Sequence, residues 1–323
     1  MPITGVTSYL PTMDEFIAHW VSANAALTGG GEPVLALKGG YTLANFQTDR
    51  AALDTALLDV EARLNGRELA AAERDQRKLA LRSRMSQFRN GVQCYLQATP
   101  YEAALPLAPE ISSDESKFLS PFLDMSNLWN RINTDTIAGF TAPLLLAGGY
   151  TLAQFTTELT AMRTAFVNVT NAEQNLTLSR DERDALLAPI RLRLNQYRSA
   201  IPARFDENDP LVSSLPALSP PPGSTPDPVT ASGTWDAANE VGVLTWTAST
   251  AATLTGYSIR TAPGPTYHTD EETIVGSAPS GTATFSTTAG LTTSGSTALF
   301  KVYVLTSTGN EKGSNTVSIS RPV

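Results

Sequence analysis

The sequence predicts a multidomain chain in which a duplicated helical body precedes an all-β sandwich. The first observation is a repeat: residues 39–46 read GGYTLANF and residues 148–155 read GGYTLAQF, 109 positions later. The second is a proline-rich stretch at residues 206–228. The third is a change, after that stretch, to segments in which apolar and polar residues alternate. We therefore expect helices over about the first two-thirds of the chain and strands over the rest.

The repeat extends well beyond the eight-residue motif, because the offset of 109 positions persists on both sides of it; Trp20, for example, recurs as Trp129. We assign residues 1–111 to a first helical repeat and residues 112–205 to a second. Each repeat is predicted to hold three helices with one apolar face. The two could close a single bundle or form two small bundles in tandem, and the short connection between them favours close packing.

The first helix of the first repeat is predicted at residues 12–28, where Phe16, Ile17, Trp20 and Val21 recur at a spacing of three to four residues. Three glycines, at residues 29–31, are expected to end it.

The second helix is predicted to begin after the glycine pair of the repeated motif. Thr42 is the expected N-cap, and in the second copy Thr151 forms a capping box with Gln154, where the first copy has Asn45. The expected apolar face of this helix comprises Phe46, Leu53, Leu57, Val60 and Leu64.

The third and longest helix is predicted at residues 67–98, after a break at residues 65–66, which are Asn and Gly. The corresponding break in the second copy is expected near residues 177–179, with Ser179 as the cap, and Pro189 is expected to kink the helix or restart it. Its apolar stripe is Leu81, Met85, Phe88 and Val92, and the same positions in the second copy are Ile190, Leu194, Tyr197 and Ile201.

Residues 206–228 contain seven prolines, which argue against a helix there and favour an extended, semi-rigid linker. Beyond the linker, five runs predict strands separated by turns: residues 241–247, 256–260, 283–287, 298–305 and 316–320.

Residues 229–323 resemble a fibronectin type III domain. The matching segments are Pro228-Val229 at its start, Leu244-Thr245-Trp246, the run from Leu254 to Tyr257, the run from Phe300 to Val304, and the run from Gly313 to Val317. The resemblance implies a seven-stranded immunoglobulin-like sandwich with Trp246, Tyr257 and Phe300 in its core, which serves as a spacer or adhesion module. Because the proline-rich linker isolates this domain, we expect it to fold alone. Phe300 stands where the family usually has its corner tyrosine, so the hydroxyl-to-backbone bond of that corner is expected to be absent.

Composition excludes several classes of protein. The formal net charge is −8 and only 17% of residues are charged, which argues against a nucleic-acid partner. No apolar run approaches the ~20 residues of a membrane helix. The N-terminus lacks the basic start and apolar run of a signal peptide. Cys94, the single cysteine, can form no internal disulfide and is expected to pack as a small hydrophobic side chain.

No pattern in the sequence indicates an enzyme or a cofactor. His19 and His268 lie in different domains and neither has the spacing of a metal ligand, so we expect His19 to be a tolerated helix residue. The only candidate for a metal is a weak calcium site at three consecutive carboxylates, Asp270, Glu271 and Glu272, although a solvated acidic loop is the simpler interpretation.

The most regular charged set is arginine. Each member of the first copy recurs in the second, and the full set is Arg74, Arg82, Arg84 and Arg89 with Arg183, Arg191, Arg193 and Arg198. Three interpretations stay open: intrachain salt bridges to carboxylates of the second helix, contacts with another subunit, and binding of an anionic polymer.

Three functions compete on this evidence. The first is a non-enzymatic structural protein that self-assembles into a homo-oligomer, lattice, tube or filament through its helical body, while the fibronectin-like domain projects or docks on a neighbour. The second is an adhesion or carbohydrate-binding module that engages carbohydrate or a surface protein. The third, an unrecognised helical enzyme, is disfavoured by the scarcity of histidine. The fibronectin resemblance favours an extracellular or cell-surface location, and the missing signal peptide argues against it.

Overall fold

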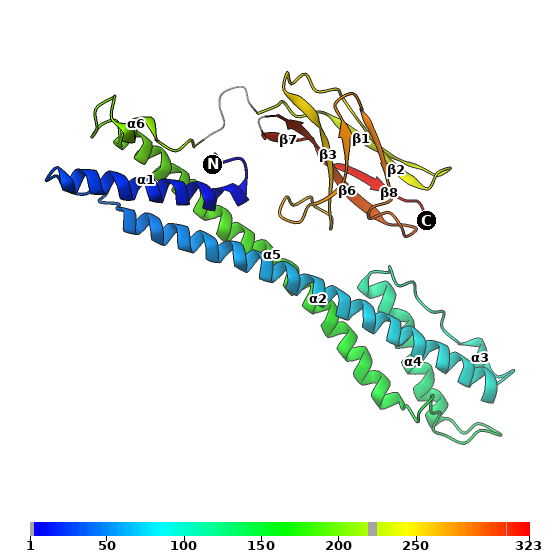
Figure 1. The fold of residues 1–323 in the computed structure, drawn as a ribbon. Coiled ribbons are helices and arrows are strands. Elements are labelled where there is room, and N and C mark those ends of the chain that lie inside the picture. Colours follow the sequence, from blue (N-terminus) through cyan, green and yellow to red (C-terminus); the bar gives the residue numbers. More distant parts are fainter. Residues whose placement is uncertain (1–2, 219–224, 308) are drawn as a thin grey trace. The chain divides into compact units, whose positions relative to one another are not determined.

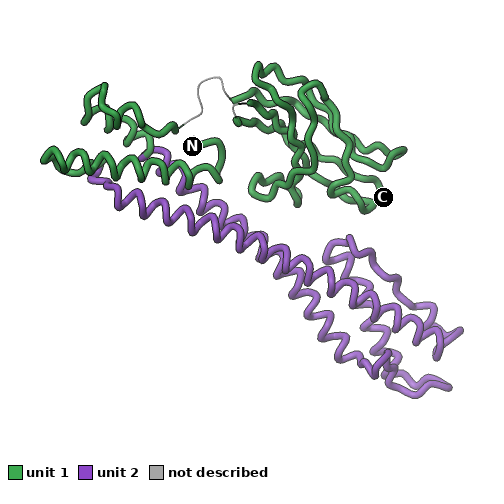
Figure 2. The backbone as a smooth tube through the Cα atoms, viewed as in Figure 1, with its two compact units in different colours: residues 1–38, 194–323 green, residues 39–193 purple. Residues whose placement is uncertain are grey.

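The computed structural model describes residues 3–218, 225–307 and 309–323. The chain divides into two compact units, which Figure 2 shows in different colours. One unit comprises Met1–Lys38 and Leu194–Val323, and the other comprises Gly39–Arg193.

The helical part contains four substantial helices, which are α1 (Tyr9–Gly29), α2 (Leu43–Tyr95), α4 (Glu115–Thr134) and α5 (Leu152–Ala200) (Figure 1). Three single-turn elements accompany them: η1 (Val6–Ser8), α3 (Pro100–Ala103) and α6 (Pro210–Ser213). None of the described helices is long and apolar enough to pass through a membrane.

Both long helices begin as the repeated motif predicts. The backbone N–H of Thr42 donates to the side chain of Asn45, and that of Thr151 donates to Gln154. Ahead of each cap lies a pair of glycines with positive φ, including 82° at Gly39, a conformation in which a residue with a side chain would be strained. The motif therefore encodes a sharp turn into a capped helix, and it does so twice.

The predicted breaks at residues 65–66 and 177–179, and the predicted restart at Pro189, are wrong. Helix α2 continues through residues 65–66, and α5 continues through residues 177–179 and through Pro189. Each repeat thus has one short and one long helix in place of three. A glycine within a helix costs only about 1 kcal/mol relative to alanine, and many neighbouring turns offset that cost. Ser179 bonds back to the carbonyl of Leu176 within the helix and caps nothing.

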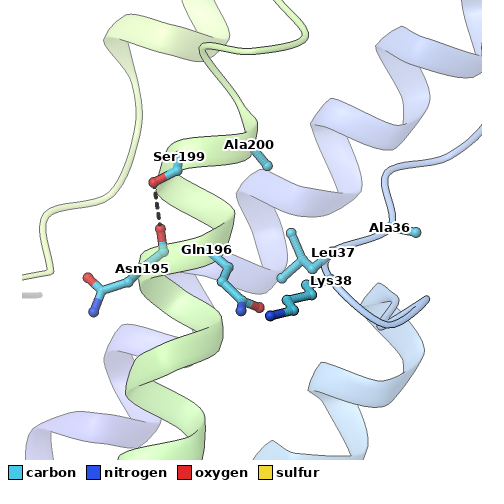
Figure 3. Close-up of a pocket in the computed structure, with 7 residues that line it drawn as sticks. All are labelled: Ala36, Leu37, Lys38, Asn195, Gln196, Ser199 and Ala200. Atoms are coloured by element: carbon cyan, nitrogen blue, oxygen red, sulfur yellow. Dashed lines mark hydrogen bonds between the residues drawn. The ribbon is translucent and has the colours of Figure 1, made fainter.

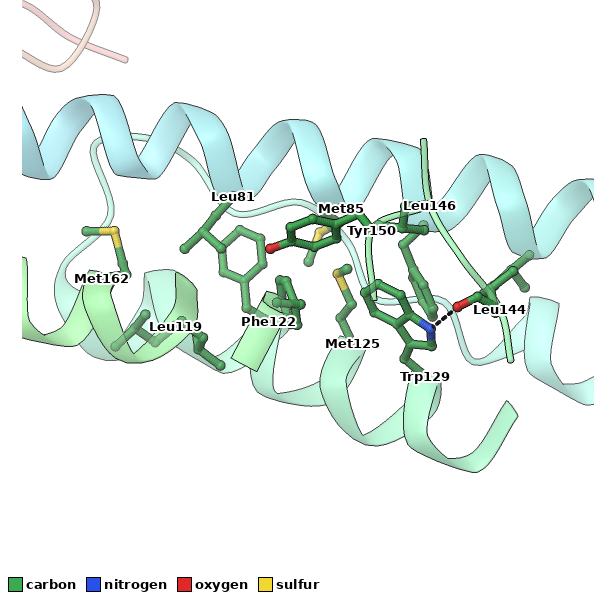
Figure 4. Packing of buried hydrophobic residues seen from close by; sticks show 14 of the residues in the cluster. Leu81, Met85, Leu119, Phe122, Met125, Trp129, Leu144, Leu146, Tyr150 and Met162 are labelled. Atoms are coloured by element: carbon green, nitrogen blue, oxygen red, sulfur yellow. Dashed lines mark hydrogen bonds between the residues drawn. The ribbon is translucent and has the colours of Figure 1, made fainter. Parts of the chain in front are cut away.

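The core of the second unit is formed by α4, the C-terminal half of α2 and the N-terminal half of α5 (Figure 4). Trp129 of α4 is fully buried, its ring centroid lies 5.5 Å from that of Phe88 and 5.8 Å from that of Phe155, and its indole N–H donates to the carbonyl of Leu144 at 2.9 Å. The predicted stripe residues of both copies are all buried, which confirms the helical periodicity: Leu81, Met85, Phe88, Val92, Ile190, Leu194, Tyr197 and Ile201.

The expectation for Cys94 is wrong, because its side chain is exposed. Cys94 lies two residues beyond the buried Val92, and two residues correspond to about 200° around a helix, so the side chain faces away from the core.

The last third of the chain is a sandwich of two antiparallel sheets. Its described strands are β1 (Ala231–Asp236), β2 (Val241–Trp246), β3 (Leu254–Ala262), β4 (Thr273–Pro279), β5 (Thr284–Thr287), β6 (Thr297–Thr306), β7 (Glu311–Gly313) and β8 (Val317–Ser320). One sheet has the order β1-β2-β5, and the other has the order β4-β3-β6-β7 with β8 also paired to β6 (Figure 1). The five predicted strands are all present. Since β7 and β8 pair with the same strand, the expected seventh strand is present as two short segments.

The sandwich core lies between the two sheets and contains Trp246, Tyr257 and Phe300, which are all buried. The rings of Trp246 and Tyr257 are in contact, with centroids 5.3 Å apart. Alternate residues of β6, among them Phe300 and Val302, point into this core, as the period-two pattern requires.

The first part of the proline-rich segment is folded, contrary to the expectation of an extended linker without helix. Pro210 occupies the first position of α6, where a proline loses no hydrogen bond, and Asp209 caps that turn by accepting from the N–H of Leu211. Further along, the N–H of Ile3 donates to the carbonyl of Leu218. Residues 219–224, which include three of the seven prolines, lie outside the described residues.

Candidate functional site

The tyrosines of the repeated motif meet two of the repeated arginines. The guanidinium of Arg84 lies 3.9 Å from the ring centroid of Tyr150 and pairs with Glu158 at 3.9 Å. The guanidinium of Arg193 lies 4.2 Å from the ring centroid of Tyr41. In both cases the arginine of one repeat stacks on the tyrosine of the other, which is a favourable cation–π arrangement.

A carboxylate lies beside each of these contacts. The hydroxyl of Tyr41 donates to Asp49, whose counterpart in the second repeat is Glu158. Burial, followed by the hydrogen bond to Asp49, raises the pKa of Tyr41, and burial and Glu158 likewise raise the pKa of Tyr150. Sequence reasoning noted the arginines and the motif but missed that they are partners; the shared offset of 109 positions was the available signal.

Replacing Arg84 by lysine is expected to lower the free energy of unfolding by about 0.5–2 kcal/mol, because lysine keeps the charge but loses the planar stacking on Tyr150. Urea unfolding followed by circular dichroism measures the change. Arg63→Lys is the matched control, since Arg63 makes only an exposed pair with Asp59 on the same helix and its change should stay within about 0.5 kcal/mol. Equal losses in the two variants would contradict a specific role for the stacked contact.

The other repeated arginines have more local surroundings. Arg74 bonds to the adjacent Asp75 and Arg183 to the adjacent Asp184. Arg89 donates to the carbonyl of Pro106. The remaining members, Arg82, Arg191 and Arg198, are partly buried. The intrachain interpretation therefore describes several of these arginines, although their partners include rings and carbonyls as well as carboxylates.

His19 of α1 is buried among polar partners. Its Nδ1 lies 2.6 Å from the hydroxyl of Tyr197, and its Nε2 lies 2.9 Å from the carbonyl of Leu211 and 3.3 Å from the hydroxyl of Ser214. A carbonyl can only accept, so Nε2 carries the proton and Tyr197 donates to Nδ1. With both nitrogens engaged, His19 is placed to hold the α6 segment rather than to act as a base.

Stability should fall in mild acid because of His19. Burial lowers the pKa of His19 from its ordinary value of 6.5, and the bond to Leu211 only partly opposes this. The unfolded chain therefore takes up the proton first, so the stability that neutral His19 supports is lost as the pH falls from about 6.5 through the lower pKa of the folded state. Urea unfolding at pH 7.5 and at decreasing pH measures this loss. The control is His19→Leu, the residue found at the equivalent Leu128; an equal loss in that variant would contradict the assignment.

The outer face of the larger sandwich sheet holds a cluster of charged and aromatic residues. Arg260 bonds to Glu272 at 2.6 Å and to Glu311 at 2.5 Å, and its guanidinium lies 4.1 Å from the ring centroid of Tyr303. The hydroxyls of Tyr303 and Tyr267 also donate to Glu272. The carboxylate of Glu272 therefore accepts three hydrogen bonds, and these bonds hold the β3–β4 loop on the sheet.

The weak calcium candidate includes that carboxylate. Glu272 is held by Arg260 and two tyrosines, and Glu271 is buried. Within the described ranges, no group of three or more histidine, cysteine, aspartate or glutamate residues is arranged to hold a metal ion. Asp270 and Glu271 have interactions of their own.

A surface pocket of about 450 Å³ lies between the extended segment before α2 and the last turns of α5 (Figure 3). Its lining consists of Ala36, Leu37, Lys38, Asn195, Gln196, Ser199 and Ala200. Carboxylates, imidazoles and thiols are missing from this lining, so the pocket has the means to contact a small polar molecule but no acid–base pair for catalysis.

Each of the two long helices has an exposed side with few charged residues. The α2 edge is the exposed side of α2 opposite its buried stripe, and it comprises Ala51, Thr55, Leu58, Ala62, Asn65, Gly66, Leu69, Ala72, Glu73, Gln76 and Ala80. The α5 edge comprises the equivalent positions, Thr160, Thr164, Val167, Asn171, Gln174, Asn175, Leu178, Asp181, Glu182, Ala185 and Pro189. Glu73 is the one charge on the α2 edge, and Asp181 and Glu182 are the two on the α5 edge.

The largest apolar side chains on both edges are well exposed and recur at the same places. Leu58 is 66% exposed and its equivalent Val167 is 53% exposed, while Leu69 is 72% exposed and its equivalent Leu178 is 57% exposed. Within each edge the two side chains are separated by three turns of helix and so point the same way. A single exposed leucine is unremarkable, but here exposed apolar side chains recur in line on each helix and at equivalent positions of the two helices.

No protein-family model and no curated protein matches this chain. Among solved structures, pectate lyase Pel3 from Pectobacterium carotovorum matches with 15% sequence identity and a TM-score of 0.24, over 28% of this chain and 27% of that chain. Pectate lyase PelI from Erwinia chrysanthemi in complex with tetragalacturonic acid matches with 20% identity and a TM-score of 0.25, over 28% of each chain. An Fn3-like protein from Clostridium thermocellum matches with 20% identity and a TM-score of 0.24, over 31% of this chain and 97% of that chain.

The strand order identifies the type of fold that the last third of the chain adopts. A sheet of β1-β2-β5 facing a sheet of β4-β3-β6 with β7 and β8 is the arrangement that the resemblance implies. The C-terminal domain is fibronectin type III-like. The chain spans little more than a quarter of the length of the two pectate lyases it matches, and these matches leave the helical part uncovered.

Proposed function

We propose that this chain is a non-enzymatic structural protein that assembles with copies of itself through its helical body. The fibronectin type III-like domain projects from the assembly or docks on a neighbour. The observation that carries the proposal is the recurrence of exposed apolar side chains at equivalent positions of the α2 and α5 edges. A surface that recurs within one chain provides two docking places per copy, which is the minimum for growth into a lattice, tube, ring or filament.

The proposal includes an internal duplication of the helical body. In it, α1 and α2 form one copy, α4 and α5 form the other, and each short helix packs on the long helix of the other copy. Paired contacts support this exchange. Trp20 lies 4.7 Å from Tyr197, and the equivalent Trp129 lies 5.5 Å from Phe88, measured between ring centroids.

A second pair of contacts supports the same duplication. The N–H of Leu35 donates to the side chain of Asn24 at 2.9 Å, and the N–H of Leu144 donates to that of Asn133 at 2.8 Å. Each asparagine holds the connection between the short and the long helix of its own copy. Because the buried contacts of the two copies match residue by residue, we expect their outer surfaces to match as well.

Energetics favour covering these edges. Burying a leucine or valine side chain fully stabilises by about 1.5–3 kcal/mol, and each edge exposes two of them in surroundings of alanine, asparagine and threonine. Small neighbours allow another helix to approach closely, and the near absence of charge on the α2 edge lowers the cost of removing water.

Sedimentation velocity across a series of micromolar concentrations tests the proposal. We expect species with masses that are multiples of 34.4 kDa. The double variant Leu69→Glu/Leu178→Glu should shift the protein toward single chains, because it places charge in both edges. Leu107→Glu is the control, since Leu107 is 77% exposed and lies off both edges. A single 34.4 kDa species throughout the series would overturn the proposal and favour the adhesion or carbohydrate-binding alternative.

A further inference from the structure

We propose that residues 206–218, the α6 strap, separate from the helical body in mild acid because His19 takes up a proton. The α6 strap joins the end of α5 to the chain that leads into the fibronectin type III-like domain. Its release does not require that the chain assembles, so it is independent of the proposed function.

A histidine latch, formed by His19, Tyr197 and Leu211, joins three elements of the chain. His19 of α1 is only 9% exposed. Its Nδ1 accepts from the hydroxyl of Tyr197 on α5, and its Nε2 donates to the carbonyl of Leu211 in the α6 strap. The hydroxyl of Ser214, also in the strap, lies 3.3 Å from Nε2. One neutral imidazole thus links the strap to α1 and α5.

A proton on Nδ1 disrupts this arrangement. Nδ1 becomes a donor, so the hydroxyl of Tyr197 loses the acceptor for its own proton. Burial raises the pKa of Tyr197, so that hydroxyl stays protonated. The ring also becomes a buried cation, and its partners, two hydroxyls and a carbonyl, carry no negative charge to offset it. Release of the strap exposes the ring to water and removes both costs.

Other charged groups lie on the elements around His19. Glu15 is one turn earlier on α1, Arg198 is in the last turn of α5, and Asp209 caps α6. Carboxyl groups ordinarily titrate near about 4 and guanidinium groups above about 12, whereas histidine titrates near about 6.5. A change in the strap between about pH 5.5 and 7.5 therefore points to His19.

The first repeat has an equivalent strap. Residues 96–108, the α3 strap, match the α6 strap at an offset of 110 positions. Each strap begins with a single helical turn that has proline in its first position. The residues that recur are Pro100, Leu105 and Pro106 in the α3 strap and Pro210, Leu215 and Pro216 in the α6 strap.

The equivalent of the latch in the first strap contains no histidine. The three counterparts all lie in or against the core of the second unit. The pairs are His19 and Leu128, Tyr197 and Phe88, and Leu211 and Tyr101. The α3 strap is also held by Arg89, which donates to the carbonyl of Pro106 and keeps its charge at any physiological pH. Since the chain itself holds one strap without a histidine, packing alone does not require one at position 19.

The two straps lead to different parts of the chain. The α3 strap continues into α4, whereas the α6 strap continues toward the sandwich, whose first strand begins at Ala231. At the far end of the α6 strap, the carbonyl of Leu218 accepts from the N–H of Ile3. Each residue that is released can add up to about 3.3–3.6 Å to the reach of the tether. Mild acid thus lengthens the tether of the sandwich while the α3 strap stays in place.

Proton linkage sets the size of the effect. Burial lowers the pKa of His19 from its ordinary value of 6.5, so the closed strap takes up a proton less readily than the open strap. The closed state therefore loses stability relative to the open state as the pH falls below about 6.5, by up to about tenfold between pH 7.5 and 5.5. At higher pH His19 is neutral in both states and the ratio is constant.

Hydrogen–deuterium exchange of the full chain, followed by mass spectrometry, tests the proposal. Each exchange rate is divided by the intrinsic rate at the same pH, which gives a protection factor. We expect the protection factor of the α6 strap to fall by up to about tenfold from pH 7.5 to 5.5, while those of α1 and the α3 strap stay constant.

Three variants isolate the proton on His19. His19→Gln keeps a donor and an acceptor but cannot be protonated, and His19→Leu installs the residue found at Leu128. Two different replacements are used so that one remains informative if the other fails to hold the strap. In both, we expect protection of the α6 strap that does not change with pH. His268→Gln is the matched control, since His268 is the other histidine of the chain, and it should keep the full pH dependence.

Three results would overturn the proposal. The first is protection of the α6 strap that stays constant with pH in the unaltered chain. The second is a fall of the same size in His19→Gln and His19→Leu, which would assign the effect to another group. The third is an equal fall in α1 and the α3 strap, which would show that the whole helical body loosens and that the strap is not released by itself.

Discussion

Replacing Trp129 by alanine is expected to lower the free energy of unfolding of the helical body by about 3–5 kcal/mol. Trp129 is fully buried and touches Phe88 of α2 and Phe155 of α5, so it joins all three helices of this core. Its removal also leaves the carbonyl of Leu144 without the indole N–H that it accepts from. Urea unfolding followed at a helical circular dichroism band measures the loss.

The matched control for Trp129 lies on the same helix. Leu123 is 39% exposed, so Leu123→Ala removes an apolar side chain from α4 without opening a cavity and should cost less than about 1 kcal/mol. A loss at Trp129 no larger than the loss at Leu123 would contradict the packing of α4 against both long helices.

Replacing Trp246 by alanine is expected to destabilise the fibronectin type III-like domain by about 3–5 kcal/mol. Trp246 is 6% exposed and packs on Tyr257 between the two sheets. Its indole N–H has no hydrogen-bond partner in the described part of the chain, so the cost comes from packing alone. This distinguishes it from Trp129, whose replacement removes a hydrogen bond as well.

Tryptophan fluorescence and near-ultraviolet circular dichroism during urea unfolding measure the effect at Trp246. The control is Trp235→Ala on β1, because Trp235 is only partly buried at the margin of the same core and should cost clearly less. Equal costs for the two tryptophans, or a cost below about 1 kcal/mol for Trp246→Ala, would show that the core is not centred where the sheets place it.

Local sequence rules predicted the parts of the fold that depend on local chemistry. The period-two runs located the strands, and the apolar stripes located the buried faces of the long helices. The caps at Thr42 and Thr151 followed from residue types that satisfy free backbone groups. All of these features are determined by residues that are close together in the sequence.

The continuity of α2 and α5 was not predictable in this way. The residues that suggested breaks, Gly66 and Pro189, carry real local costs, of about 1 and 3 kcal/mol. Gly66 and Pro189 are both exposed, on the α2 and α5 edges, so neither obstructs the buried stripe. Whether a helix of some fifty residues tolerates such a residue depends on tertiary packing on both sides of it, which a local rule does not weigh.

The choice of partners was not predictable from periodicity either. The two repeats carry the same stripe, so the pattern identifies the inward face of a helix but not the copy that this face meets. The stacking of Arg84 on Tyr150, and of Arg193 on Tyr41, settles that choice for the motif tyrosines. Among the candidate residues, the arginines were therefore found by sequence, while their aromatic partners and the polar setting of His19 required the structure.

Electron microscopy of the purified protein tests the central claim, that the helical bodies associate side by side through their outer edges, most directly. The account predicts extended rows, rings or tubes in which helical bodies repeat laterally, and it predicts that Leu69→Glu/Leu178→Glu reduces them to separate particles. Uniform, isolated particles of the size of one 34.4 kDa chain in the unaltered protein would contradict it.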